Sequence, residues 1–167
     1  MTGVSAALTV FELERLGFTH AIVIPDSESA RLFDSLGASG SIDVICPCRE
    51  GESIAIAAGL WTGGAKPIVV IQNTGLMEAG DAIRGCGLGP RIPLRLMIGW
   101  RGHEGWEAGR RPIDSAYTYT EPVLAAWGIP YVPLMSDDDI GTIEEMDRTA
   151  AATSMPSAVL TGYPFLP

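Results

Sequence analysis

The sequence predicts an α/β fold: a single three-layer αβα domain over residues 1–167, with about six mostly parallel strands. Apolar, strand-sized segments alternate with helix-like segments along the whole chain, as in a parallel sheet with helices on both faces. The segment from Pro67 to Gln72 is apolar up to its last residue, which is typical of a central strand buried on both faces.

The individual elements follow from apolar patterning and from the residues that interrupt it. Glycine or proline ends most of the segments, for example at Gly17, Gly37 and Gly63. We expect helices at 6–16, from Asp26 or Ser27 to 36, at 50–62, 76–86, 121–127 and 137–152. We expect strands at 20–24, 42–45, 67–72, 93–99, 131–134 and 158–161. Residues 100–116 contain Gly, Arg and Pro without periodicity, so we expect a long loop there.

Composition excludes several classes of protein. The net charge of -9 argues against a nucleic-acid-binding protein, which normally carries a basic face. No apolar run approaches the roughly 18 residues that a membrane span needs, so no membrane segment is expected. The chain has 3 cysteines and 2 histidines without paired metal-ligand spacing, so we expect no metal site. Because no signal region is evident, we expect a cytoplasmic protein with reduced thiols.

Polar side chains follow four successive strands of the predicted sheet, although the strands themselves are apolar. These segments are 25–27, 49–50, 72–75 and 100–103. In sheets of this kind, ligands bind beyond the carboxyl ends of the strands. The sequence therefore predicts a binding site at this edge of the sheet.

Glu50 stands out among these residues because it begins an alanine-rich helix that has almost no polar face. A carboxylate leading into a buried helix is costly unless it has a partner or a task. The simpler explanation is that Glu50 compensates the charge of the helix N-terminus. Glu52 is the competing carboxylate, but two residues further on it points to a different side of the helix.

Taken in order, these segments resemble the pyrimidine-binding (PYR) domain of thiamine-diphosphate enzymes. The likeness is to the alpha subunits of sulfopyruvate decarboxylases and to the N-terminal half of phosphonopyruvate decarboxylases. It spans nearly the full chain. The segments that carry it are 24–27, 49–59, 67–76, 92–94 with 100–102, and 128–131.

The resemblance implies a role for each candidate residue. Glu50 would be the catalytic acid that hydrogen-bonds the cofactor's aminopyrimidine and so assists proton removal from the thiazolium carbon. Asp26 would lie near the reacting substrate. The remaining residues implied are Asn73, Thr74 and Gly75 for the cofactor, and Ser27, Arg49, Arg101 and His103 for the substrate. For Asp26, Asn73 and Thr74, helix capping is the alternative role, and the arginines also suit a solvated loop.

Two departures from the family pattern matter. Where the family has a small Gly-Leu-Gly-Asn run, this chain has Met77, Glu78 and Asp81, which add bulk and two carboxylates near the site. The chain also lacks the Gly-Asp-Gly and Asn segments with which the family binds Mg²⁺ and the diphosphate. The resemblance therefore implies a separate diphosphate-binding (PP) beta subunit in a hetero-oligomer, with the cofactor between the subunits.

The function implied is that of an alpha subunit of a two-component thiamine-diphosphate-dependent decarboxylase. Its substrate would be a 3-substituted 2-oxo acid of the sulfopyruvate or phosphonopyruvate type, and its products an aldehyde and CO₂. One alternative is a carboligase that forms acyloins, in which Met77 and Trp100 would help to make a larger acceptor pocket. The other is a binding module of the same fold without catalytic activity.

Overall fold

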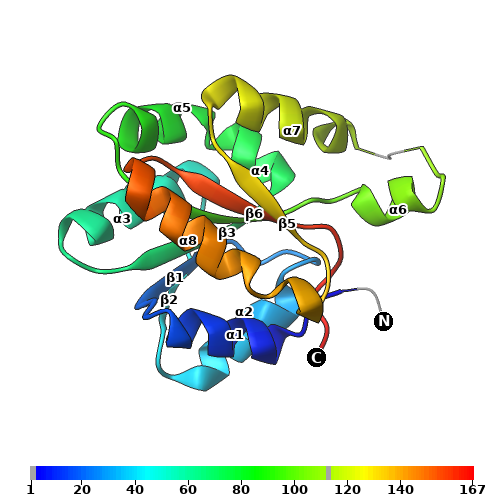
Figure 1. The fold of residues 1–167 in the computed structure, drawn as a ribbon, viewed down its shortest axis with the longest axis horizontal. Helices are drawn as coiled ribbons and strands as arrows, with labels where there is room; N and C mark the ends of the chain where they lie inside the picture. Colours follow the sequence, from blue (N-terminus) through cyan, green and yellow to red (C-terminus); the bar gives the residue numbers. More distant parts are fainter. Residues whose placement is uncertain (1–2, 112–113) are drawn as a thin grey trace.

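The computed structural model describes residues 3–111 and 114–167. Within them, six strands form one sheet in the order β2-β1-β3-β4-β6-β5, and every neighbouring pair is parallel (Figure 1). The strands are β1 (His20–Val23), β2 (Asp43–Ile45), β3 (Pro67–Gln72), β4 (Arg95–Gly99), β5 (Tyr131–Leu134) and β6 (Ser157–Thr161). The predicted α/β fold with a mostly parallel sheet is confirmed.

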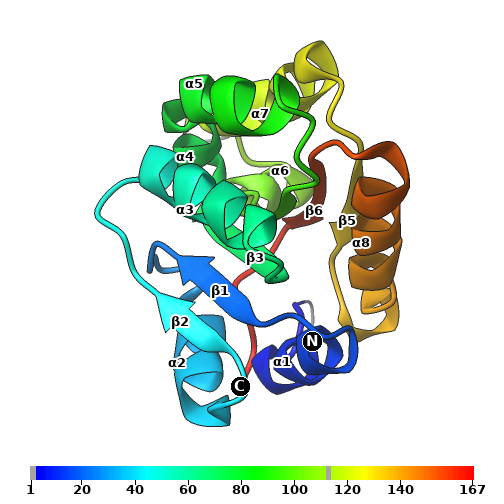
Figure 2. The same cartoon turned by 90° about the vertical axis from the view of Figure 1, so that its left-hand side faces the viewer.

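Helices cover both faces of the sheet, which gives three layers (Figures 1 and 2). One face packs against α1 (Ala6–Arg15), α2 (Ala30–Ser39) and α8 (Thr142–Thr153). The other packs against α3 (Glu50–Thr62), α4 (Asn73–Glu78), the π-helix η1 (Ile83–Leu88) and α7 (Ser115–Trp127). The shorter elements are α5 (Gly80–Ala82), α6 (His103–Glu107) and the 3₁₀ helix η2 (Asp137–Asp139).

Alternate strand residues supply the two halves of the core. Val70 of β3 joins the cluster under α1, α2 and α8, whereas Val69 and Ile71 join the cluster under α3, α4 and α7. Successive side chains of a strand point to opposite faces of the sheet, so an unbroken apolar run serves both layers. Among the described residues, no helix is both long and apolar enough to cross a membrane.

The predicted end of the second helix is wrong. The helix begins at Ala30 and runs past Gly37 to Ser39, and it stops at Gly40, whose φ of 67° is left-handed. Glycine tolerates this conformation without the steric cost that a Cβ brings, so it commonly ends a helix there. Gly37 is an interior residue of α2.

Other boundaries also differ from the prediction, by one or two residues at several strand ends and by more at the following helices. The helix after β3 begins at Asn73 rather than Leu76, and it continues as α5 and η1 instead of one regular helix. The expected loop over 100–116 contains α6, and α7 begins at Ser115, where the Asp114 Oδ1 accepts a hydrogen bond from the Ala116 N–H at 2.9 Å. The helix expected at 137–152 is divided into η2 and α8.

Candidate active site

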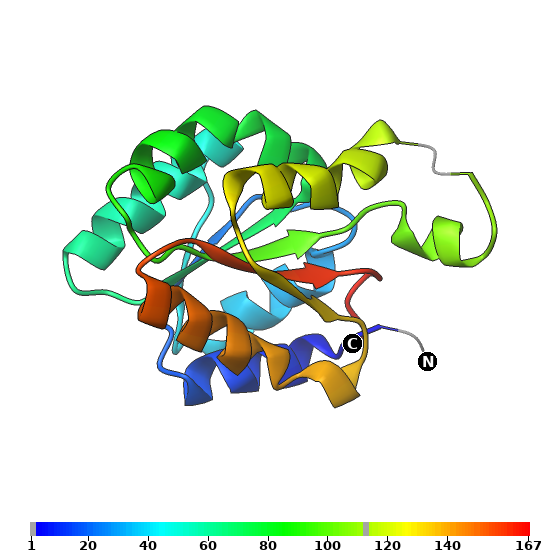
Figure 3. The ribbon, with the colours of Figure 1, turned by 45° about the horizontal axis from the view of Figure 1, so that its top comes forward.

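The carboxyl ends of the strands lie at one edge of the sheet, as the parallel register requires. Gln72, the last residue of β3, is level with Gly99 of β4, which in turn is level with Thr161 of β6. Figure 3 shows the arrowheads of β4 and β6 pointing to the side on which α6 lies. Candidate residues that follow β1 to β4 are thus brought to this edge, and the end of β6 joins them there.

Glu50 and Gly75 are in direct contact at this edge. Glu50 is the first residue of α3, and Gly75 is a buried residue of α4. A Cβ added to Gly75 would lie 2.6 Å from Glu50 Oε1 and 2.8 Å from its Cδ, so only glycine leaves room for the carboxyl group. Glu50 is partly exposed. Its carboxyl has no hydrogen-bond partner among the side chains and backbone groups of residues 3–111 and 114–167.

Asn73 is fully buried and holds the start of α4 to two neighbouring segments. Its Nδ2 donates hydrogen bonds to the Arg101 backbone oxygen and to Thr120 Oγ1, both at 3.2 Å. Its Oδ1 has no partner in the described part of the chain. Thr74 is exposed, and its hydroxyl donates to Gln72 Oε1 at 3.1 Å. Asn73 therefore orders the turn, and contact of either side chain with a cofactor stays a prediction.

Asp26 caps the turn that follows β1. Its Oδ1 accepts hydrogen bonds from the backbone N–H groups of Glu28 at 2.7 Å and Ser29 at 2.9 Å. The first residue of α2 is Ala30, so Asp26 caps the turn ahead of the helix and not the helix itself. Ser27 is exposed between them. The helix-capping role expected as the alternative is therefore wrong, because Asp26 stabilises the preceding turn instead, and a role near the substrate stays a prediction.

Arg49 and the additional carboxylate Glu78 form an ion pair beside the start of α3. Arg49 donates to Glu78 Oε1 from Nη2 at 2.7 Å, while Glu78 Oε2 accepts the Gly51 N–H at 2.9 Å. The Arg49 hydrogen bond, followed by that of Gly51, lowers the pKa of Glu78. Asp81 pairs with Arg84 on the surface instead. Glu78 thus neutralises Arg49 and occupies an N-terminal donor of α3.

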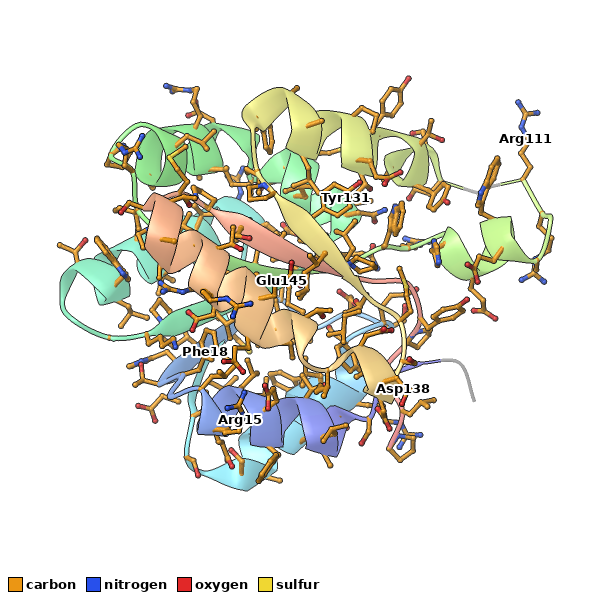
Figure 4. All side chains as sticks on the ribbon, in the orientation of Figure 1. Arg15, Phe18, Arg111, Tyr131, Asp138 and Glu145 are labelled. Carbon is orange, nitrogen blue, oxygen red and sulfur yellow. The ribbon has the colours of Figure 1, made fainter. Side chains whose placement is uncertain are left out.

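A cavity of about 480 Å³ lies at the ends of β1, β4 and β6. Its polar lining includes Glu28, Arg101, Glu104, Arg110, Arg111 and Asp114. Arg101 approaches Asp114 at 4.0 Å. Figure 4 shows Arg111 projecting outward from the segment that follows α6. The candidate Arg101 therefore lines a cavity of mixed charge.

Sequence reasoning missed Glu28, which lines this cavity from the turn after β1. Burial raises the pKa of the Glu28 carboxyl, the Asp26 carboxylate raises it further, and Arg101 opposes both effects. In the sequence, Glu28 looks like the acidic residues that often precede helices. The one feature that could have marked it as a candidate is its position two residues after Asp26.

His103 lies in an aromatic cluster and is absent from the cavity lining. Its ring stacks on Trp100 with centroids 4.7 Å apart, and the ring of Tyr163 meets it edge-on at 5.7 Å. The Nε2 atom is 3.4 Å from Glu107 Oε1, and the buried Nδ1 has no partner among the described residues. His103 thus anchors α6 to the end of β6, and contact with a substrate stays a prediction.

Metal-binding groups are not gathered here. In the part of the chain that the structure describes, no group of three or more His, Cys, Asp or Glu side chains is arranged to hold a metal ion. The cysteines Cys46, Cys48 and Cys86 are free.

Comparison with known proteins supports the family likeness that the sequence suggested. A sulfopyruvate decarboxylase of Methanosarcina acetivorans is 29% identical over 114 residues, which cover 67% of this chain and 28% of that protein. A phosphonopyruvate decarboxylase of Streptomyces viridochromogenes is 30% identical over 102 residues, covering 61% of this chain and 26% of that protein. The chain is similar to sulfopyruvate and phosphonopyruvate decarboxylases.

The extent of the match differs between relatives. The chain spans about a quarter of the length of the two decarboxylases just named. In contrast, the alpha subunit of a sulfopyruvate decarboxylase from Methanococcus maripaludis is 25% identical over 146 residues, which cover 86% of both chains. No family model matches the chain. The likeness to this alpha subunit extends over most of the length of both chains.

Proposed function

We propose that this chain is the alpha subunit of a two-component, thiamine-diphosphate-dependent decarboxylase. Its substrate is a 3-substituted 2-oxo acid of the sulfopyruvate or phosphonopyruvate type, and its products are an aldehyde and CO₂. The names of the similar proteins support decarboxylation, and the match to an alpha subunit over 86% of both chains supports the subunit role. The cytoplasmic location expected from the sequence stays a prediction.

The contact between Glu50 and Gly75 carries this proposal. A carboxyl group that activates an aminopyrimidine needs a fixed position, partial shielding from water and a free oxygen. Glu50 is fixed at the start of α3 by its contact with Gly75, and its carboxyl has no hydrogen-bond partner within the described residues. The residues present therefore fit the pyrimidine half of the cofactor. When bound, thiamine diphosphate supplies a sink for the electron pair left when CO₂ departs.

The diphosphate half of the site belongs to a second subunit in this proposal. The Gly-Asp-Gly and Asn segments that hold Mg²⁺ and the diphosphate in the family are absent from the sequence. The name of the Methanococcus maripaludis relative, a subunit alpha, supports a partner chain. We therefore assign Mg²⁺ binding to a PP-domain beta subunit, with the cofactor between the two chains of a hetero-oligomer.

The mixed-charge cavity suits a small acid with an anionic head group. Arg101 and Arg110 line it from the segments that follow β4 and α6, and the side chain of a third lining residue, Arg111, projects outward. Arginine binds carboxylate, sulfonate and phosphonate oxygens through its planar set of donors. Three carboxylates in the same lining, Glu28, Glu104 and Asp114, balance the charge of the three arginines when all six groups are ionised. The head group would therefore be bound by individual arginine side chains rather than by a net positive charge.

The decisive experiment combines the purified chain with a candidate beta subunit, thiamine diphosphate and Mg²⁺. Sulfopyruvate, phosphonopyruvate and pyruvate are supplied in turn, and CO₂, aldehyde and acyloin are measured. We expect CO₂ and aldehyde from one of the two anionic substrates. Acyloin as the main product would favour the carboligase alternative, and no turnover of any 2-oxo acid would contradict the proposal.

A pair of variants tests the role of Glu50. Glu50→Gln is expected to lower CO₂ release by a factor of 10² or more, because an amide cannot transfer a proton to the aminopyrimidine (general acid–base catalysis typically contributes about 10²–10⁴-fold). The matched control is Glu52→Gln, on the exposed side of the same helical turn, where Glu52 Oε2 accepts the Cys48 N–H at 3.0 Å. Equal activity of the two variants would remove Glu50 from its proposed role.

A further inference from the structure

Glu28 is placed at the same edge of the sheet as Glu50, but at the end of β4. A Cβ built on Gly99 would be 3.6 Å from the Glu28 Cβ, so Glu28 lies against the end of β4. Gly99 is level with Gln72, which directly precedes α4 and its Gly75. Glu50 rests on Gly75. The two carboxyl-bearing residues therefore lie at the ends of neighbouring strands, Glu28 at β4 and Glu50 beside the helix that follows β3.

The carboxyl of Glu28 faces a cavity rather than a fixed partner. It lines the cavity of about 480 Å³, and its carboxyl accepts no hydrogen bond from residues 3–111 and 114–167. The backbone oxygen of Glu28 is fixed by the Phe165 N–H at 3.1 Å. The residue is thus anchored by its main chain while its side chain is free to act on a bound molecule.

Charged groups of both signs surround Glu28. Asp26 lies in its own turn, Arg101 follows β4, and Glu104 belongs to α6. The remaining charged groups of the cavity lining are Arg110, Arg111 and Asp114. Burial and the neighbouring Asp26 carboxylate raise the pKa of Glu28, so its neutral, proton-bearing form persists to higher pH than that of an exposed glutamate.

Asp26 is less suited to carry an exchangeable proton. Its Oδ1 accepts two backbone N–H groups at 2.7 and 2.9 Å, which commits this oxygen to the turn. A carboxyl group that must give up and regain a proton works best without such fixed donors. Within this turn, Glu28 therefore has the free carboxyl and Asp26 has the capping role.

We propose that Glu28 is the acid that protonates the carbon from which CO₂ has departed. This inference rests on the proposed decarboxylase function. The overall change is R–CO–COO⁻ + H⁺ → R–CHO + CO₂: a C–C bond breaks, and its electron pair forms a C–H bond with the proton from Glu28. Glu28 then regains a proton from water through the cavity. The acid is distinct from Glu50, whose role is toward the cofactor.

The test separates the release of CO₂ from the protonation of carbon. With hexacyanoferrate(III) present, the electron pair left on the carbon is removed as two electrons, according to R–CO–COO⁻ + H₂O → R–COO⁻ + CO₂ + 2 H⁺ + 2 e⁻. This route needs no proton on the carbon. In the reconstituted complex, Glu28→Gln is expected to lower aldehyde formation about 10²-fold while the hexacyanoferrate-coupled rate changes less than about threefold.

Control variants make the result specific. Glu52→Gln removes an exposed carboxylate outside the cavity lining and is expected to keep the wild-type ratio of aldehyde formation to coupled oxidation. Glu28→Asp retains a carboxyl and is expected to restore part of the aldehyde formation. If Glu28→Gln lowers both rates equally, or neither, Glu28 is not the proton donor.

A second measurement needs no cofactor and no partner. A ¹³C NMR titration of the Glu28 carboxyl in the chain alone is expected to give a midpoint above the ordinary 4.5, and a lower midpoint in Asp26→Asn, which keeps an oxygen for the turn. A midpoint at or below 4.5 overturns the inference. Failure of the proposed function would show differently, as absence of CO₂ release by the wild-type complex with every 2-oxo acid.

Discussion

The carboxyl group of Glu50 rests directly on the backbone of Gly75. The contact joins the first turn of α3 to the first turn of α4, and it is so close that a Cβ on Gly75 would lie 2.5 Å from Glu50 Cγ. It fixes the direction of an acidic side chain that no hydrogen bond holds within the described residues. The position of the proposed catalytic acid therefore depends on residue 75 being a glycine, which has no side chain.

Gly75→Ala is expected to displace Glu50 and to lower CO₂ release of the reconstituted complex by at least about tenfold, because small misplacements of catalytic groups have large effects. The added methyl group should also lower the free energy of unfolding by about 1–3 kcal/mol. Gly37→Ala is the matched control, because a Cβ added at this position inside α2 would have no atom within 4 Å. It should raise stability by about 0.5–1 kcal/mol. Unchanged activity of Gly75→Ala would mean that the contact does not position Glu50.

Asn73→Ala should lower the free energy of unfolding by about 2 kcal/mol, measured by urea denaturation. The Arg101 carbonyl and the Thr120 hydroxyl would lose a buried donor. Thr74→Ala, at the next and exposed position, should change the same quantity by less than about 0.5 kcal/mol. Undiminished stability of Asn73→Ala together with weakened cofactor binding would instead favour the cofactor contact predicted from the sequence.

Asp147→Asn should destabilise the protein by roughly 3 kcal/mol. Asp147 pairs with the buried Arg95 at 2.9 Å and with Lys66 at 2.7 Å, and removing its charge leaves the Arg95 guanidinium without an anion. Chemical denaturation measures this change in the free energy of unfolding. Asp81→Asn, which breaks the exposed pair with Arg84, should change stability by no more than about 0.5 kcal/mol. Equal effects of the two substitutions would show that burial of the Arg95 ion pair does not increase its contribution to stability.

Glu12→Gln should reduce the loss of stability that the protein shows as the pH becomes acidic. The Arg15 guanidinium donates to both oxygens of Glu12 and lowers the pKa of that carboxyl below its ordinary 4.5. The stabilisation is therefore complete above pH 4.5, and it is lost as the pH falls through the lower pKa of the folded state. Thermal unfolding of wild type and variant between pH 6 and pH 2.5 measures it. Parallel curves would show that Glu12 contributes nothing to acid unfolding.

The sequence predicted the limits of some elements closely and those of others, such as β4, less closely. The limits of β3 and α3 agree with the expected ranges, because an unbroken apolar run and an alanine-rich helix bounded by glycines leave little choice. Boundaries were missed where tertiary contacts override local signals. In α2, for example, the helix continues through the exposed Gly37 because Leu32 and Leu36 are buried on its inner face.

The candidate site was predicted less completely. Its location at the carboxyl ends of the strands followed from the sequence, since polar segments follow four successive predicted strands. The pairing of Arg49 with Glu78 and the burial of Asn73 and His103 did not follow. Each depends on contacts between segments distant in the chain, and a residue's type does not reveal whether it is exposed.

By itself, the sequence determined the α/β fold and brought Asp26, Glu50, Asn73 and Arg101 to one edge, because apolar periodicity fixes which segments are strands. Only the tertiary structure decided how these residues face one another. It set Glu50 on Gly75, and it turned Glu28 toward the cavity while Asp26 caps the turn. The physical reason is that packing between helices, loops and strand ends, rather than local pattern, orients a side chain and sets its exposure to water.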